Sequence, residues 1–301
     1  MNEPKGVLQQ QIRQYLFAVS ALVLCFGQTL FHWVSFAVSS DLYSEVLLIP
    51  IISVYLVWAR KGVLPRAGEP DKTIASVCLV TGLALIGTFW GCIFFGVKFQ
   101  AVDSLAMTIP SFVFLLWAFS AWFLGRRLVR ALAFQLGFLI LMSPLPSFLR
   151  EIIEAQLQHY SALSALGLFE MTGMPVFYTD LKFELSDISL RVAPECSGIH
   201  SSLALFITSL VAGHLFLKSN WKRTMLALAV APLAVIRNGF RIFTIGELCV
   251  HIGPQMIDSK IHHKGGPIFF ALSLIPFLIL LYLLIRSERP AADRKPILNE
   301  A

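Results

Sequence analysis

Charged residues are scarce in this 301-residue chain, at 14% against about 25% in ordinary soluble domains. Apolar residues make up 56% of the chain, and the mean hydropathy is +0.73. These values exclude an ordinary soluble domain and indicate a protein of the lipid bilayer. The net charge of +6 is no nucleic-acid signal, because the basic residues fall mostly in short clusters between apolar runs, as in cytoplasmic loops.

Cysteines are few, and their spacing predicts no metal site. The five cysteines include no Cys-x-x-Cys pair, and the histidines and carboxylates are not spaced for zinc or another metal. We therefore expect neither a metal nor a cofactor. Repeats and low-complexity stretches are absent as well. No cleavable signal peptide is evident, so the first apolar run is interpreted as a retained helix.

Long apolar runs, in contrast, are abundant. A membrane-spanning helix needs about 20 mostly apolar residues. We predict an all-α integral membrane protein, a single multi-pass domain over 1–301 with about eight transmembrane helices. Lys and Arg cluster in every second connection, which places those connections and both termini in the cytoplasm. The predicted spans are 15–37, 44–59, 74–97, 104–124, 128–146, 198–217, 223–247 and 267–285.

The longest outer connection, 144–195, is predicted to form a small extracytoplasmic cap. Residues 147–168 carry apolar side chains at helical spacing opposite a polar face, which predicts an amphipathic helix along the membrane interface. Gly173 and Pro175 then end this helix. Short β-like runs bounded by turn residues follow, at 176–178, 182–185 and 188–192.

Three side chains that could take part in catalysis are predicted to lie at one depth in the membrane. At about 1.5 Å of rise per residue, Cys196, Arg241 and His262 lie roughly 33, 28 and 36 Å from the basic ends of their segments. The hydrocarbon core is about 30 Å thick. All three groups therefore reach the outer boundary between hydrocarbon and headgroups.

Each of these residues also has an ordinary interpretation. A lone cysteine usually packs, and an outer-loop histidine is usually solvated. An arginine near a helix end usually reaches to the headgroups. Cys196 could also form a disulfide with Cys249. Against these interpretations, Pro and Gly flank Cys196, and Arg237 shares a helix face with Arg241, as functional ionisable residues in membranes do.

Together the three side chains fit acyl transfer. A thiolate attacks a carbonyl when a nearby base or cation activates it. His262 can act as the base and later protonate the leaving amine. Arg241 can stabilise the oxyanion. Four neighbouring residues are candidates for substrate binding: Glu195, Arg237, Asn238 and His263.

Three motifs in this order resemble the exosortase/archaeosortase family of membrane transpeptidases. They are Pro194-Glu195-Cys196-Ser197-Gly198-Ile199, Asn238-Gly239-Phe240-Arg241, and His262-x-x-x-Gly266-x-x-Phe269. The resemblance spans nearly the whole chain. It departs from the family pattern at Glu45-Val46, where many members carry His-Gly.

The resemblance implies a role and a partner. Such proteins cleave a C-terminal sorting signal (a short motif, a transmembrane helix, then a basic cluster) on exported proteins, and pass the new C-terminus to an acceptor. It implies Cys196 as nucleophile, Arg241 as oxyanion stabiliser and His262 as acid and base. The implied location is the inner (plasma) membrane, with the active site facing outside.

Two other functions are compatible with a polytopic membrane chain. A transporter or polysaccharide-export component requires polar groups near the midplane and broken helices, but the midplane of this chain is nearly uncharged. A membrane thiol oxidoreductase requires paired reactive cysteines, for which Cys196 and Cys249 are the candidates. The sequence does not reveal the recognition motif, the acceptor or the oligomeric state.

Overall fold

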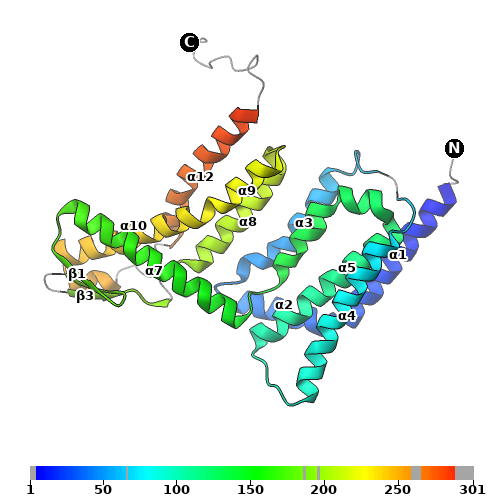
Figure 1. Ribbon diagram of the computed structural model, residues 1–301, viewed down its shortest axis with the longest axis horizontal. Coiled ribbons are helices and arrows are strands. Elements are labelled where there is room, and N and C mark those ends of the chain that lie inside the picture. Colours follow the sequence, from blue (N-terminus) through cyan, green and yellow to red (C-terminus); the bar gives the residue numbers. More distant parts are fainter. Residues whose placement is uncertain (1–4, 66, 186–187, 195–196, 259–265, 289–301) are drawn as a thin grey trace, which may run out of the picture. The chain divides into compact units, whose positions relative to one another are not determined.

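The computed structural model describes residues 5–65, 67–185, 188–194, 197–258 and 266–288, and these are mostly helical (Figure 1). The chain divides into two compact units, Met1–Leu149 and Arg150–Ala301. The single domain over 1–301 and the cap over 144–195 stay predictions.

The first unit consists of helices and short 3-10 turns. In chain order these elements are α1 (Lys5–Cys25), α2 (Gly27–Ser39), η1 (Ser44–Leu47), α3 (Leu48–Ala59), α4 (Lys72–Phe94), α5 (Ala101–Ala131), α6 (Ala133–Phe138) and η2 (Leu139–Met142). The second unit contains the remaining elements: α7 (Ser147–Thr172, which begins just before the division), β1 (Val176–Thr179), β2 (Lys182–Leu185), β3 (Ile188–Arg191), α8 (Ile199–Phe216), α9 (Asn220–Leu228), α10 (Val230–His251), η4 (Pro254–Asp258) and α12 (Gly266–Glu288).

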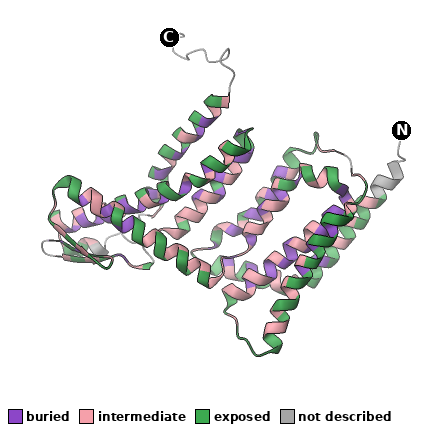
Figure 2. Ribbon diagram, in the orientation of Figure 1, coloured by how far each residue is buried: buried purple, intermediate pink, exposed green. Residues whose placement is uncertain are grey.

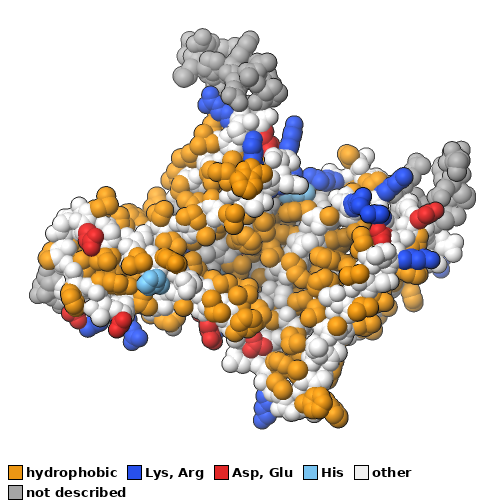
Figure 3. Space-filling view, in the orientation of Figure 1, with side chains coloured by type: hydrophobic (Ala, Val, Ile, Leu, Met, Phe, Trp, Pro, Cys, Tyr) orange, Lys and Arg blue, Asp and Glu red, His pale blue; other side chains and the backbone are white. Residues whose placement is uncertain are grey.

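Several helices are long and apolar enough to cross a membrane. In the described part of the chain there are five: Lys72–Phe94, Ala101–Ala131, Ile199–Phe216, Asn220–His251 and Gly266–Glu288. Two bent helix pairs raise the number to seven if each pair is one span. Hydrophobic side chains cover much of the visible surface over the helices (Figure 3). The chain is therefore a multi-pass membrane protein, as predicted, whereas the predicted count of eight spans is not confirmed.

The spans that differ from the prediction are short or bent. Residues 44–59 form a shorter apolar helix. The predicted span 15–37 bends by 67° between α1 and α2, where Gly27 begins the second helix and glycine weakens a helix interior. The predicted span 128–146 is also interrupted, because α5 ends at Ala131, α6 covers only Ala133–Phe138 and η2 ends at Met142. Pro144 and Pro146 follow, and proline disfavours continuation of the preceding helix.

The long helix α5 contains a kink at Gly125, whose φ is 78°. A Cβ at this position would lie 2.5 Å from the Glu69 carbonyl oxygen. The amide of Gly68 donates to the Leu124 carbonyl at 3.1 Å. Glycine therefore allows the connection before α4 to pack directly on the α5 backbone, which no hydropathy pattern reveals.

The three predicted β-like runs are strands in the structure, and they form one antiparallel sheet in the order β1-β2-β3. Phe183 and Leu185 point to the buried face of β2, while Lys182 and Glu184 are exposed. This alternation is the period-2 pattern of a half-buried strand. Gly173, at φ 72°, ends α7 before the sheet, as expected.

Helix α7 packs closely against α10 at two glycines of α10. A Cβ on Gly239 would lie 2.6 Å from the Ser164 Cβ, and one on Gly246 would lie 2.5 Å from the Phe169 ring. Phe169 itself is fully buried and packs on Phe183 and Phe243, with ring centroids 5.6 and 5.1 Å apart. The ring therefore has little freedom to move away.

We expect Gly246→Ala to destabilise the protein by about 1–3 kcal/mol, the usual cost of overpacking. The added methyl group overlaps a ring that is held on both sides. Thermal unfolding in detergent micelles measures the effect. The matched control is Gly167→Ala in α7, where a Cβ meets nothing within 4 Å; there the change should be neutral or stabilising, since alanine is the better helix former. Equal midpoints for the two variants would contradict the packing argument.

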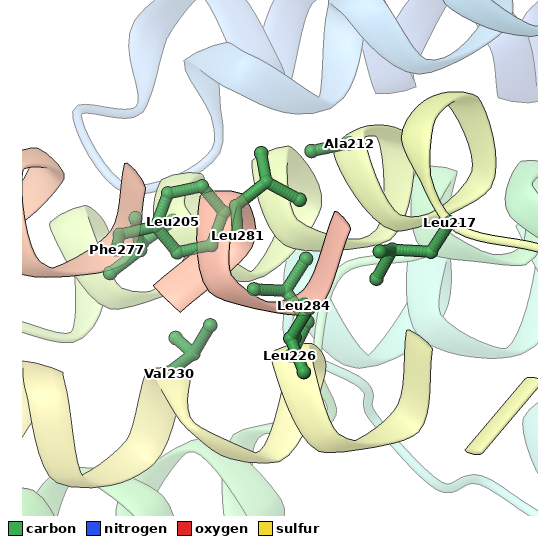
Figure 4. Close-up of a cluster of buried hydrophobic side chains, with 8 residues drawn as sticks. All are labelled: Leu205, Ala212, Leu217, Leu226, Val230, Phe277, Leu281 and Leu284. Carbon is green, nitrogen blue, oxygen red and sulfur yellow. The ribbon is translucent and has the colours of Figure 1, made fainter. Parts of the chain in front are cut away.

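A second core joins α8, α9, α10 and α12. Figure 4 shows Phe277, Leu281 and Leu284 of α12 among side chains of the other three helices. The buried residues of α12 recur every three or four positions and form one stripe along the helix (Figure 2). Such a stripe is typical of a helix that packs along one face and leaves the others to lipid.

The carboxylate of Glu288 holds the C-terminal end of α12 in place. Glu288 accepts hydrogen bonds from the backbone amides of Lys218 and Ser219, at 2.8 and 2.9 Å. These two amides immediately precede α9, whose first residue is Asn220. The end of α12 is thus attached to the connection between α8 and α9. Helices α9 and α10 join into one 32-residue stretch, Asn220–His251.

Candidate active site

The structure describes some of the predicted site residues and not others. Arg237, Asn238 and Arg241 lie on α10. Cys196, Glu195, His262 and His263 lie outside the described residues. The site is therefore built from α10 and from the residues on either side of the cysteine in the chain.

The chain turns sharply just before α8. The Ser197 amide donates to the Pro194 carbonyl at 2.9 Å. Gly198 follows with φ 72° and ψ 17°, a left-handed conformation that glycine adopts without steric cost. The Gly198 carbonyl then accepts the Ser202 amide at 3.0 Å and begins α8.

Polar side chains of α10 contact this turn directly. Arg237 Nη2 donates to the Gly198 carbonyl and to Ser202 Oγ, both at 3.1 Å. A Cβ on Gly198 would lie 3.1 Å from both Arg237 Nη2 and Asn238 Oδ1. Two motifs far apart in the sequence are therefore in contact. In the first motif, Cys196 precedes Gly198 by two residues. In the second, Arg241 follows Arg237 by one helical turn.

The two arginines of α10 differ in their surroundings. Arg237 is 7% exposed and Asn238 is 2% exposed. Arg241 is half-buried and lines a cavity. Arg237 thus faces the protein interior at the start of α8, whereas Arg241 borders a space that another group can occupy.

That cavity lies between β3 and α10 and has a volume of about 40 Å³. Its lining consists of four apolar residues, two arginines and one asparagine: Leu190, Arg191, Val192, Asn238, Arg241, Ile242 and Ile245. A low-polarity wall strengthens the interaction of a guanidinium with a developing negative charge. The cavity is small, so it suits a single small group and not a whole peptide segment.

Arg191 is a cavity residue that the sequence reasoning missed. It ends β3 and precedes Pro194 by three positions. An isolated basic residue in a short β-like run gave no chemical signal by itself. Its position close before the cysteine motif was the available clue.

Cys249 lies in the last turn of α10. It is a free cysteine, and the residue is only 1% exposed. Such burial is typical of a packing cysteine. It gives no support to a disulfide with Cys196 or to a pair of reactive cysteines. Within the described ranges, no three His, Cys, Asp or Glu side chains gather as metal ligands.

Comparison with known proteins identifies the family of the chain. The family model described as transmembrane exosortase (Exosortase_EpsH) matches residues 33–279. The match covers most of the chain and contains all the candidate residues from Glu195 to His263. No curated protein and no solved structure matches the chain.

Proposed function

Because the chain belongs to the transmembrane exosortase family, we propose that it is a membrane-embedded cysteine transpeptidase or protease. Its substrates are exported proteins that end in a short motif, a transmembrane helix and a basic tail. It cleaves at the motif, at the outer boundary of the membrane, and passes the new C-terminus to an acceptor. The acceptor is water or an amine.

One observation carries this proposal: the contact between the start of α8 and the Arg237-Asn238 pair of α10. Gly198 follows the candidate nucleophile by two residues, and Arg241 follows Arg237 by one helical turn. This contact supports the proposal because it links the residues that follow Cys196 in the chain to the helix that carries Arg241. Both motifs lie within the residues 33–279 that the family model matches.

The proposed reaction has two halves. Cys196 Sγ attacks the scissile carbonyl carbon as a thiolate, after its proton passes to His262, and Arg241 stabilises the oxyanion. The carbon–nitrogen bond breaks, and His262 gives the proton to the leaving amine. A thioester remains. The acceptor amine or water then attacks the thioester and loses a proton, and the thiol is restored.

Neighbouring residues are assigned to the bound peptide. Asn238 borders the cavity of Arg241 and is proposed to hydrogen-bond the substrate backbone. Glu195 and His263 flank the two catalytic groups in the sequence and are proposed to contact the residues around the scissile bond. Arg191 is added to this set because it lines the same cavity.

The proposed location is the inner (plasma) membrane. Both termini are cytoplasmic, and the reaction takes place on the outer side. Basic clusters in alternate connections support this orientation. The basic tail of the substrate then stays in the cytoplasm, while its scissile bond reaches the outer boundary.

A nucleophile trap tests the thioester. The protein is reconstituted in liposomes with a tagged substrate that ends in the motif, helix and basic tail, and hydroxylamine is added. We expect mass spectrometry to find a hydroxamate at the new C-terminus, because hydroxylamine attacks thioesters. Cys196→Ala, the control, should give neither cleavage nor hydroxamate. Cleavage that yields only a free acid at every hydroxylamine concentration argues for direct attack by water and against covalent catalysis.

A further inference from the structure

We propose that Arg237 is a positioning residue that ties the start of α8, and with it the segment carrying Cys196, to the helix that carries Arg241. This inference rests on the proposed cysteine chemistry. It gives Arg237 a role different from contact with the substrate.

The hydrogen bonds of Arg237 cross between two helices. Its Nη2 donates to the Gly198 carbonyl and to Ser202 Oγ, each at 3.1 Å. Both acceptors belong to the first turn of α8. The guanidinium lies one helical turn before Arg241 on α10, so these bonds set how far the α8 start lies from the Arg241 cavity.

The first turn of α8 has its own local hydrogen bonds. The Gly198 carbonyl also accepts from the Ser202 amide at 3.0 Å, from Ser202 Oγ at 2.7 Å and from Ser201 Oγ at 3.2 Å. Removal of the guanidinium therefore leaves this carbonyl with partners. The turn itself does not require Arg237, whereas its attachment to α10 does.

Arg237 is also a costly side chain for a purely structural role. It is 7% exposed, and its Nη1 has no hydrogen-bond partner in the described part of the chain. Among the ion pairs of the described residues, none involves Arg237. A buried charge of this kind stabilises a fold no better than an apolar side chain of similar volume, and its use is better explained by geometric specificity.

The backbone at Gly198 makes this position sensitive to displacement. Its φ of 72° is left-handed, and Arg237 and Asn238 fill the space where a side chain would begin. A shift of the α8 start moves everything attached to it, and Cys196 is two residues away along the chain. Misplacement of a reacting group by about 1 Å can cost on the order of 100-fold in rate.

The decisive variant is Arg237→Met, which removes the guanidinium but keeps an unbranched side chain. For purified protein in liposomes, we expect kcat for cleavage of the tagged substrate to fall by about 10- to 100-fold, with KM little changed. The thermal unfolding midpoint should stay near that of the wild type, because the first turn of α8 keeps its local bonds.

The matched control is Arg223 of α9, which binds the other end of α8. Arg223 Nε and Nη2 donate to the Leu217 carbonyl at 2.9 and 2.7 Å, where α8 ends. Arg223→Met should lower the unfolding midpoint but leave kcat per folded enzyme unchanged. A loss of kcat without a loss of stability in Arg237→Met, and the reverse in Arg223→Met, distinguishes a positioning role from a role in stabilising the fold.

A milder pair of variants keeps the proposal testable if Arg237→Met does not fold. Ser202→Ala removes one acceptor, and Arg237→Lys keeps the charge but loses the forked donor geometry; both should lower kcat, the second more strongly. A wild-type kcat in folded Arg237→Met and Arg237→Lys overturns the proposal, as does a change in KM alone. Failure of the cysteine chemistry is seen separately, as full cleavage by Cys196→Ala.

Discussion

Cys196→Ala is expected to abolish release of the sorting signal, with a loss of activity on the order of 10⁴-fold or more, as for other covalent nucleophiles. The reason is that no thioester can form without the sulfur, and the remaining groups only bind and polarise the peptide. Cys196→Ser should also be inactive, because a hydroxyl in the same place ionises far less readily than a thiol. Processing of the tagged substrate in liposomes, followed by mass spectrometry, measures the loss.

Cys249→Ala is the natural control for this experiment. Cys249 is free and 1% exposed, so its loss costs packing and leaves cleavage of folded protein intact. A requirement for both cysteines would instead favour thiol–disulfide chemistry. Cleavage by Cys196→Ala at the wild-type rate would remove the nucleophile from the proposed mechanism.

Arg241→Ala should lower kcat by about 10²–10³-fold, the usual effect of removing one donor to a developing oxyanion. The guanidinium borders a small apolar cavity, where a charge acts more strongly than in water. Arg241→Lys should recover only part of the loss, since an ammonium lacks the planar pair of donors. Steady-state rates at saturating substrate separate this effect from weaker binding.

An exposed arginine provides the comparison. The Arg126 side chain is 62% exposed and makes an ion pair with Asp71 at 3.5 Å, a type of interaction that contributes little. Arg126→Ala should therefore leave kcat unchanged. If Arg241→Ala lowers the rate no more than this control, Arg241 has no part in the chemistry.

Local patterns predicted the small elements of the second unit well. The β-like runs became β1, β2 and β3 because side chains alternate between buried and exposed along them, as in Lys182–Leu185. Gly173 ended α7 as expected because its left-handed φ closes the helix. Both features depend on residues near one another in the sequence.

Features that depend on distant packing were not predictable. The predicted span 104–124 ends just before Gly125, yet hydropathy did not reveal that α5 continues to Ala131 through a kink there, on which the connection before α4 packs. The count of eight spans is not confirmed for a related reason, since the predicted span 15–37 bends and the predicted span 128–146 is interrupted. Hydropathy measures what enters lipid and does not record where a helix changes direction.

The candidate site was predictable in part. Spacing put Arg237 and Arg241 on one helix face, and the structure keeps both on α10. Spacing did not distinguish the buried arginine that contacts Gly198 from the one that borders the cavity. To tell the two arginines apart, one must know where α8 lies relative to α10, and two short sequence motifs do not give that position.

Helices α9 and α10 form one candidate span, Asn220–His251, and on the proposed function this has a consequence for the choice of substrate. Such a span separates Arg241 from Lys222, the end proposed to be cytoplasmic, by roughly 28 Å along the helix axis. A substrate helix with its basic tail at the level of Lys222 would then have to bring its scissile bond to the level of Arg241. We therefore expect sorting signals whose apolar helix is several residues too short or too long to be rejected by length alone, whatever motif they carry.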